Sequence, residues 1–101
     1  MTDMTVANII REQVGHRALY MMGAKNLVGD ESSLTWKVGR NAKGVTHVKV
    51  ALDPTDTYTV SFIRVGRAPG YKITELGSSS MVYSDQLRTS IESGTGFYLN
   101  L

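Results

Sequence analysis

The chain has 101 residues, no cysteine and a net charge of +2. This length suits one domain over residues 1–101 with a modest core, and the lack of cysteine excludes disulfide frameworks, thiolate metal sites and a cysteine nucleophile. No apolar run approaches the ~20 residues that a membrane span needs, and the N-terminus lacks the basic and apolar regions of a secretory signal.

The first part of the chain predicts a helix, a strand and a loop. Val6, Ile9, Ile10 and Val14 recur at helical spacing, so we expect an amphipathic helix over residues 3–14. Residues 17–22, RALYMM, are apolar on both sides and predict a short central strand. Residues 23–33 contain glycine, asparagine and aspartate and predict a loop. The loop does not match the G-x-x-x-x-G-K-[ST] pattern that cradles phosphate.

The next segment predicts a strand and a tight connection. Leu34, Trp36 and Val38 alternate with polar residues, so we expect a strand over residues 34–38 with Trp36 as a core anchor whose indole N–H is bonded at the margin. Residues 39–44 have two glycines and an asparagine, which suit a hairpin loop. The tip of this loop is the best local candidate for contact with phosphate, through Arg40, Asn41 and Lys43.

The strongest pattern is a hairpin over residues 46–65. Val48, Val50 and Leu52 alternate with His47, Lys49 and Ala51, and the sequence Asp-Pro-Thr-Asp at 53–56 follows. Proline at the second position favours a type I turn, in which the first aspartate accepts a hydrogen bond from the backbone two residues on. Residues 57–65 alternate again, so the hairpin is predicted to have one apolar and one wetted face.

The last third predicts a weaker strand and a second helix. Residues 66–70 are rich in glycine and proline and break the sheet, and residues 71–76 predict a further strand. Ser78–Ser80 are expected to cap a helix over residues 80–93, with Tyr83, Leu87 and Ile91 as its apolar stripe and Gly94 as its end. The apolar tail TGFYLNL predicts either an edge strand or pairing with a second copy in a homodimer.

Together these elements predict an α+β fold. We expect a single antiparallel sheet of four to five strands, with an N-terminal and a C-terminal helix packed on one face. The apolar face of such a sheet is unstable alone, which is why both helices are expected to cover it.

The charges are distributed unevenly along the chain. Residues 36–73 contain seven basic and two acidic residues, 7 − 2 = +5, and the rest contains four basic and seven acidic residues, 4 − 7 = −3. Such a dipole favours contact with a polyanion or an acidic protein, although lysines on strands also serve to prevent edge-to-edge pairing. The candidate residues for binding a partner or nucleic acid are Lys37, Arg40, Asn41, Lys43, His47, Lys49, Arg64, Arg67 and Lys72.

The residues that carry chemistry are sparse. His16 and His47 are the only histidines, and they belong to different predicted elements. We find no H-x-x-x-H pair, no nucleophile elbow and no paired carboxylates. The sequence therefore predicts no enzyme activity, no metal and no cofactor.

The order of several short segments resembles a family of small proteins from tailed bacteriophages and prophages whose function is unassigned. The segments are GAKN-x-VGD, RNAKG, L-x-P-x-DTY and YxDxL, at residues 23–30, 40–44, 52–58 and 83–87. The resemblance covers most of the chain beyond the first helix. It implies a phage origin and the cytoplasm of a bacterial host, and it implies no reaction.

Three functions follow as hypotheses. The first is an accessory protein that binds a host or phage protein and blocks or redirects it, including a host defence system. The alternative is a nucleic-acid-binding accessory protein that uses the basic face of the sheet, although its total charge is low and exposed aromatics interleaved with the basic residues are lacking. A structural or assembly role is the second alternative.

Overall fold

The computed structural model describes residues 5–39, 41, 43–66, 70 and 72–96. Its five strands form one antiparallel sheet in the order β1-β2-β3-β4-β5. The predicted α+β fold is therefore confirmed. The elements are α1 (Thr5–Val14), α2 (His16–Met21), β1 (Lys25–Gly29), β2 (Ser33–Lys37), β3 (His47–Leu52), β4 (Tyr58–Val65), β5 (Ile73–Val82), a 3-10 turn (Ser84–Gln86) and α3 (Leu87–Thr95).

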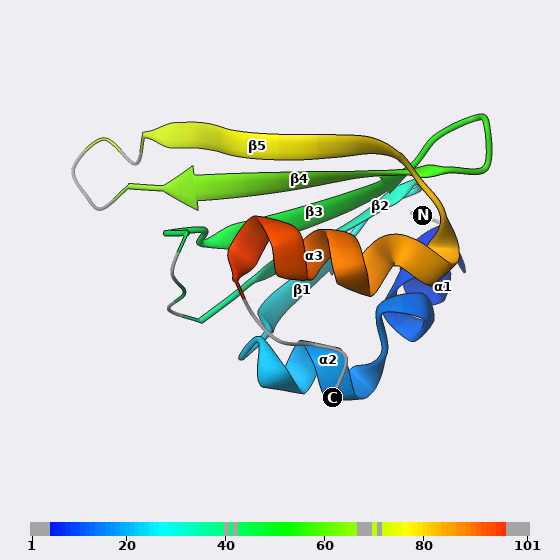
Figure 1. The fold of residues 1–101 in the computed structure, drawn as a ribbon, viewed down its shortest axis with the longest axis horizontal. Coiled ribbons are helices and arrows are strands. Elements are labelled where there is room, and N and C mark those ends of the chain that lie inside the picture. Colours follow the sequence, from blue (N-terminus) through cyan, green and yellow to red (C-terminus); the bar gives the residue numbers. More distant parts are fainter. Residues whose placement is uncertain (1–4, 40, 42, 67–69, 71, 97–101) are drawn as a thin grey trace.

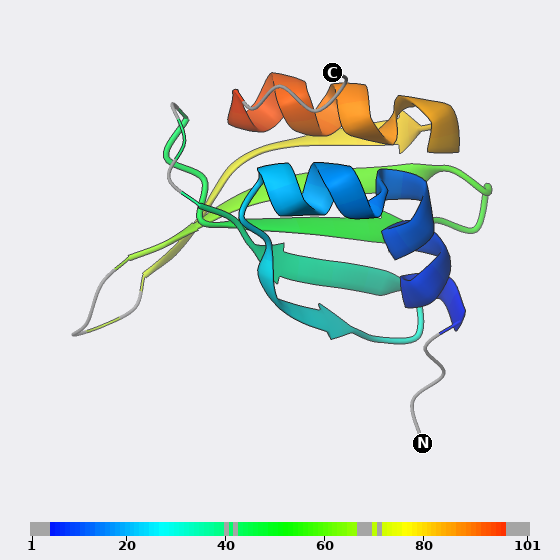
Figure 2. The same ribbon diagram turned by 90° about the horizontal axis from the view of Figure 1, so that it is seen from below.

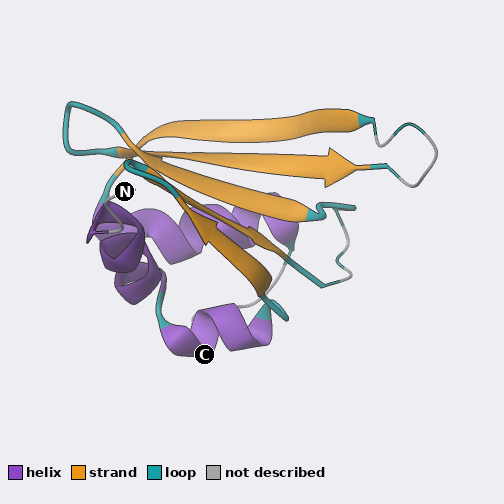
Figure 3. Ribbon diagram, turned by 180° about the vertical axis from the view of Figure 1, so that it is seen from behind, coloured by secondary structure: helices purple, strands orange, loops and turns teal. Residues whose placement is uncertain are grey.

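The helices lie on one face of the sheet. In Figures 1 and 2, α1, α2 and α3 form a layer against this face. The view from behind in Figure 3 shows the strands in front of the helices. We call the side without helices the open face, and within the described part of the chain no helix covers it.

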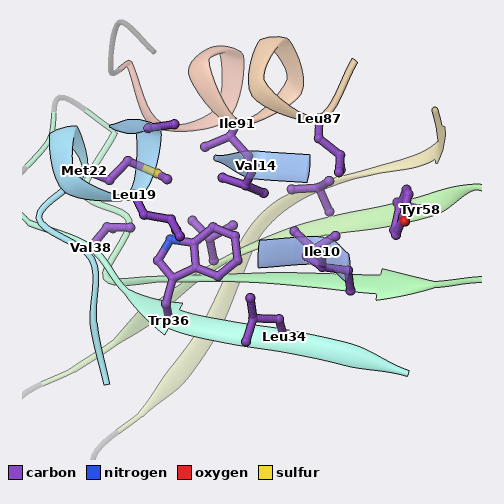
Figure 4. Close-up of a cluster of buried hydrophobic side chains, with 14 of the residues drawn as sticks. Ile10, Val14, Leu19, Met22, Leu34, Trp36, Val38, Tyr58, Leu87 and Ile91 are labelled. Carbon is purple, nitrogen blue, oxygen red and sulfur yellow. The ribbon is translucent and has the colours of Figure 1, made fainter. Parts of the chain in front are cut away.

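The core lies between the two layers and is centred on Trp36 (Figure 4). Trp36, Ile10 and Val14 are fully buried, and Leu87 and Ile91 reach them from α3. The indole Nε1 of Trp36 is also buried and has no hydrogen-bond partner among the described residues. The expectation that this N–H bonds at the margin of the core is therefore wrong, because the whole ring lies inside the core.

The central hairpin is confirmed with its predicted faces. Val48 and Val50 are buried whereas Lys49 is exposed, and β3 pairs with β4 from His47↔Ile63 to Leu52↔Tyr58. In the turn, the Asp56 backbone N–H donates to the Asp53 carbonyl oxygen at 3.0 Å. The Asp53 carboxylate accepts from Thr59 Oγ1 at 2.8 Å, so it ties the turn to β4 instead of to the backbone two residues on.

Two predictions in the first third are wrong. Residues 17–22 are mostly helical and belong to α2, because Gly15 with φ of 94° turns the chain and lets a second short helix bury Ala18 and Leu19. An apolar run of six residues does not separate a short helix from a buried strand by its period. Residues 25–29 within the expected loop form β1, where Asn26 has φ of 54° and a register shift follows Lys25.

The last third also differs from its prediction. The expected strand over residues 71–76 continues to Val82 as β5, and Ser78 and Ser79 pair with β4 instead of capping a helix. The helix begins later, at Leu87, and runs through Gly94 to Thr95. Serine is tolerated in an edge strand whose outer side meets water, so a capping pattern alone did not locate the start of this helix. Residues 97–101, which carry the apolar tail, lie outside the described residues.

Candidate binding surfaces of the sheet

The open face has a row of basic side chains that runs across three strands. The register pairs Lys25 with Lys37 and Lys37 with His47. Residues that are directly opposite in an antiparallel sheet project from the same face. We call Lys25, Lys37 and His47 the basic row. The same line of cross-strand partners continues through Ile63 on β4 to Glu75 on β5. Its positively charged end is therefore formed by β1, β2 and β3.

A second cross-strand row adds one more lysine to the open face. Here Val28, Thr35, Lys49 and Ser61 are paired in succession. Asp30 lies close enough for the charge of Lys49 to help lower its pKa. The larger causes are hydrogen bonds in the β1–β2 turn, first from the Ser32 backbone N–H at 2.9 Å and then from the Ser33 hydroxyl at 2.8 Å. The Asp30 carboxylate is therefore mainly a hydrogen-bond acceptor of the turn, and the charge of Lys49 is the smallest of the causes that lower its pKa.

His47 is half-buried at the inner end of the basic row. Its partial burial lowers its pKa, and the positive charge of Lys37 lowers the pKa further. Its Nδ1 lies 2.9 Å from Thr46 Oγ1, and the same hydroxyl bridges to β4 by accepting from the Val65 backbone N–H at 2.8 Å. These contacts hold the His47 ring at a fixed place beside Lys37.

The loop that precedes β3 is organised by Asn41. Its Nδ2 donates to the carbonyl oxygens of Gly39 at 3.0 Å and Val45 at 2.6 Å, and its Oδ1 accepts from the backbone N–H groups of Lys43 and Val45. These bonds occupy both ends of the amide, so Asn41 holds the loop in shape. A cleft of about 510 Å³ lies between this loop and the end of β4, with Arg64 among its lining residues.

The structure does not bring the predicted basic residues together on one surface. Lys37, His47 and Lys49 share the open face. Lys43 lies instead with Phe62 and Leu76 near α3. Arg64 follows Ile63 on β4 and therefore projects from the opposite face of the sheet. Lys72 is exposed, lies just before β5 and is close to Gly66. Arg40 and Arg67 lie outside the described residues. Lys25 was missed because its segment was predicted to be a loop.

The second surface is the free edge of the sheet at β5 (Figure 1). All of its residues are exposed except Gly77 and Val82. Large apolar side chains are exposed along it and just after it, at Ile73 (71%), Leu76 (44%), Met81 (60%) and Tyr83 (56%). We call these four the apolar edge. The sequence signal for it was weak, because Met81 and Tyr83 were assigned to a helix.

Two bulges in β5 coincide with exposed apolar residues. The partners change from Phe62↔Gly77 to Ile63↔Glu75, which leaves Leu76 as an extra residue. They also change from Tyr58↔Val82 to Val60↔Ser79, so Ser80 and Met81 lie opposite Thr59 alone. Met81 adopts φ of 57° at this point. Bulges redirect side chains, and here they coincide with two members of the apolar edge.

The side chains most often used in metal binding and acid–base chemistry are dispersed among the described residues. They contain no group of three histidine, cysteine, aspartate or glutamate side chains that could hold a metal ion. His16 begins α2 in the helical layer, whereas His47 belongs to the open face. Among the described helices, none has the length and apolar character needed to cross a membrane.

Comparison of the chain with protein-family models, with curated proteins and with solved structures gave no match.

Proposed function

We propose that this chain is a small protein-binding module that takes up an extended segment of its partner along β5. In the setting that the resemblance implies, it is a phage-encoded accessory protein in the cytoplasm of a bacterial host. Its partner is a host or phage protein that it blocks or redirects, and a component of a host defence system fits this description.

The observation that carries the proposal is the free edge of β5. This strand has ten residues, and β4 is its only neighbour among the described residues, so within this part of the chain one side of its backbone has no strand partner. Long edges are usually protected by charge, proline, bulges or a covering element, and β5 has two bulges and Glu75. Residues 76–84 contain no charged residue and no proline. An edge of this kind suits strand addition, in which main-chain hydrogen bonds give affinity.

The apolar edge supports the same proposal and gives the partner's chemistry. Leu76 and Met81 lie at the two bulges and are exposed, with Met81 Sδ 3.9 Å from Thr57 Oγ1. Ile73 and Tyr83 lie toward the two ends of the strand. A partner segment with apolar side chains at alternate positions would bury these four residues. At about 3.3 Å per residue the strand spans roughly 33 Å, so the partner segment should be extended, uncharged and about eight to ten residues long.

The experiment uses capture from infected or uninfected host extract with the full chain as bait. Leu76→Lys places a charge on the edge, and Met81→Asn removes an apolar side chain at a backbone conformation that asparagine tolerates well. Each variant should reduce capture of the partner at least tenfold, measured by quantitative mass spectrometry. The matched control is Val28→Lys, an exposed apolar residue on the opposite edge strand, which should leave capture unchanged.

A photoreactive residue placed at Thr74 then locates the contact. Thr74 is exposed on β5, so the partner should be crosslinked there and not from the same probe placed at Thr35 on β2. Crosslinking to a second copy of this chain would assign the edge to self-assembly, the structural alternative. Equal capture by wild type and Leu76→Lys would overturn the proposal.

A further inference from the structure

We infer that the open face binds the phosphate backbone of nucleic acid through Lys25, Lys37 and Lys49. This site is separate from the β5 edge and does not depend on the function proposed for that edge. It uses two residues among the sequence candidates and adds Lys25, which only the strand register reveals.

Like charges lie side by side in the basic row, whereas Lys49 has Asp30 nearby. Lys25 and Lys37 are direct cross-strand partners, and like charges in this position destabilise a sheet. His47 comes next on the other side of Lys37. Among the described residues, no carboxylate lies in the part of this row on β1, β2 and β3. A bound polyanion would remove the repulsion, and nothing in the described fold requires the lysines to be adjacent.

The lysines lie close together on an uncovered face of the sheet. Neighbouring strands lie about 4.8 Å apart, so the basic row and Lys49 form a compact group on a face that the described helices leave uncovered (Figure 3). Thr35 and Ser61 flank Lys49 and supply hydroxyl groups, which are frequent partners of phosphate oxygens. Contacts with the phosphate backbone of a nucleic acid need no deep pocket.

The composition of the two rows favours nucleic acid over an acidic protein. No phenylalanine, tyrosine or tryptophan occurs in either row. Protein interfaces depend on aromatic and arginine anchors, which these rows lack, whereas attraction to phosphates needs only cations. The lack of aromatic side chains also removes base stacking. Binding should therefore be independent of sequence and strongly dependent on salt.

The test is fluorescence anisotropy with labelled 20-nucleotide single strands and 20-base-pair duplexes of DNA and RNA. Three phosphate contacts predict a slope of log K against log salt of about −2 for single strands and about −2.7 for duplexes. Affinity should then fall roughly 20- to 40-fold between 50 and 200 mM NaCl. Lys25→Gln with Lys37→Gln should weaken binding at least tenfold at 50 mM and remove about two thirds of the slope.

The matched control removes the same charge from the helical layer. Arg11→Gln with Arg88→Gln changes exposed residues of α1 and α3, and it should alter affinity by less than threefold. Circular dichroism melting of both double variants checks folding, and loss of the Lys25 and Lys37 charges should leave the melting temperature unchanged or higher. Absence of binding by the wild type at 50 mM salt would overturn the inference. Equal losses in the two double variants would also overturn it, because they would indicate a general charge effect and no site.

Discussion

Gly94 lies inside α3 where the helix meets Phe62. A Cβ atom at this position would overlap the ring of Phe62. Alanine is the better helix former by about 1 kcal/mol, but overpacking a buried contact costs about 1–3 kcal/mol or more. We therefore expect Gly94→Ala to lower the free energy of unfolding by up to about 2 kcal/mol, measured by urea denaturation with the fluorescence of Trp36 as the probe.

Two further variants separate packing from helix propensity at this site. Ser93→Ala changes the exposed neighbour and should alter stability by less than about 0.5 kcal/mol. Gly94→Ala combined with Phe62→Leu should cost less than the sum of the two single changes, because the smaller side chain makes room for the methyl group. An increase in stability for Gly94→Ala would mean that α3 does not rest on Phe62.

We expect His47 to make the stability of the fold depend on pH in mild acid. Burial, and then Lys37, lowers its pKa from the ordinary value of 6.5, so protonation is less favourable in the folded chain than in the unfolded one. The stability associated with neutral His47 is complete above pH 6.5 and is lost as pH falls through the lower folded pKa. We expect His47→Gln to flatten the pH dependence of the urea midpoint below pH 6.5.

The contribution of Lys37 to this pKa is measurable by NMR titration of the His47 ring. Lys37→Gln removes a positive charge beside the imidazole and should raise its pKa toward 6.5. Lys72→Gln is the control, since Lys72 is exposed and outside the cross-strand row of His47. A pKa of His47 that does not respond to Lys37→Gln would contradict the arrangement of the basic row.

The elements that sequence predicts well here are those with a complete local signal. In β3 and β4 the alternation of Val48, Val50 and Val60 with polar residues fixes the buried face, and Pro54 marks the turn. The period of two is enough for such strands because one face is buried and the other is wet. The same reasoning placed Lys37 and Lys49 correctly on the exposed side of the sheet.

The elements that sequence misses depend on tertiary contacts. The path through β1 contains Asn26 at positive φ and a register shift, so its residues resemble a loop although β2 pairs with them. The outer strand β5 has bulges and mostly exposed side chains, and its serines match a helix cap equally well. Because the basic row depends on pairing between β1 and β2, Lys25 was not recognisable as part of a surface before the register was known.

The molecule as a whole is two-sided. All described helices lie on one face of the sheet (Figure 2), while the open face and the β5 edge remain without a described covering element. Under the two proposals, the apolar edge and the basic face would hold two ligands at once, because they are different surfaces. The two proposals therefore predict separable variants: Leu76→Lys should retain nucleic-acid binding, and Lys37→Gln should retain capture of the protein partner.

The homodimer predicted from the apolar tail is best tested by shortening the chain at the right residue. The helix α3 runs to Thr95, which is buried and donates from Oγ1 to the Ile91 carbonyl oxygen at 2.7 Å. Gly96 caps the helix with φ of 82°. A chain ending at Gly96 therefore keeps the helix and its cap, whereas one ending at Gly94 would lose a buried residue.

Sedimentation equilibrium at about 100 µM compares the full chain with the chain ending at Gly96. If the tail pairs two copies, the full chain should have a dimer mass and the shortened chain a monomer mass, because apolar residues at 97, 99 and 101 are removed. If the shortened chain keeps a dimer mass and the Leu76→Lys substitution changes it to a monomer mass, the contact between the two copies is at β5. A monomer mass for the full chain would end the dimer prediction and leave the β5 edge free for a different partner.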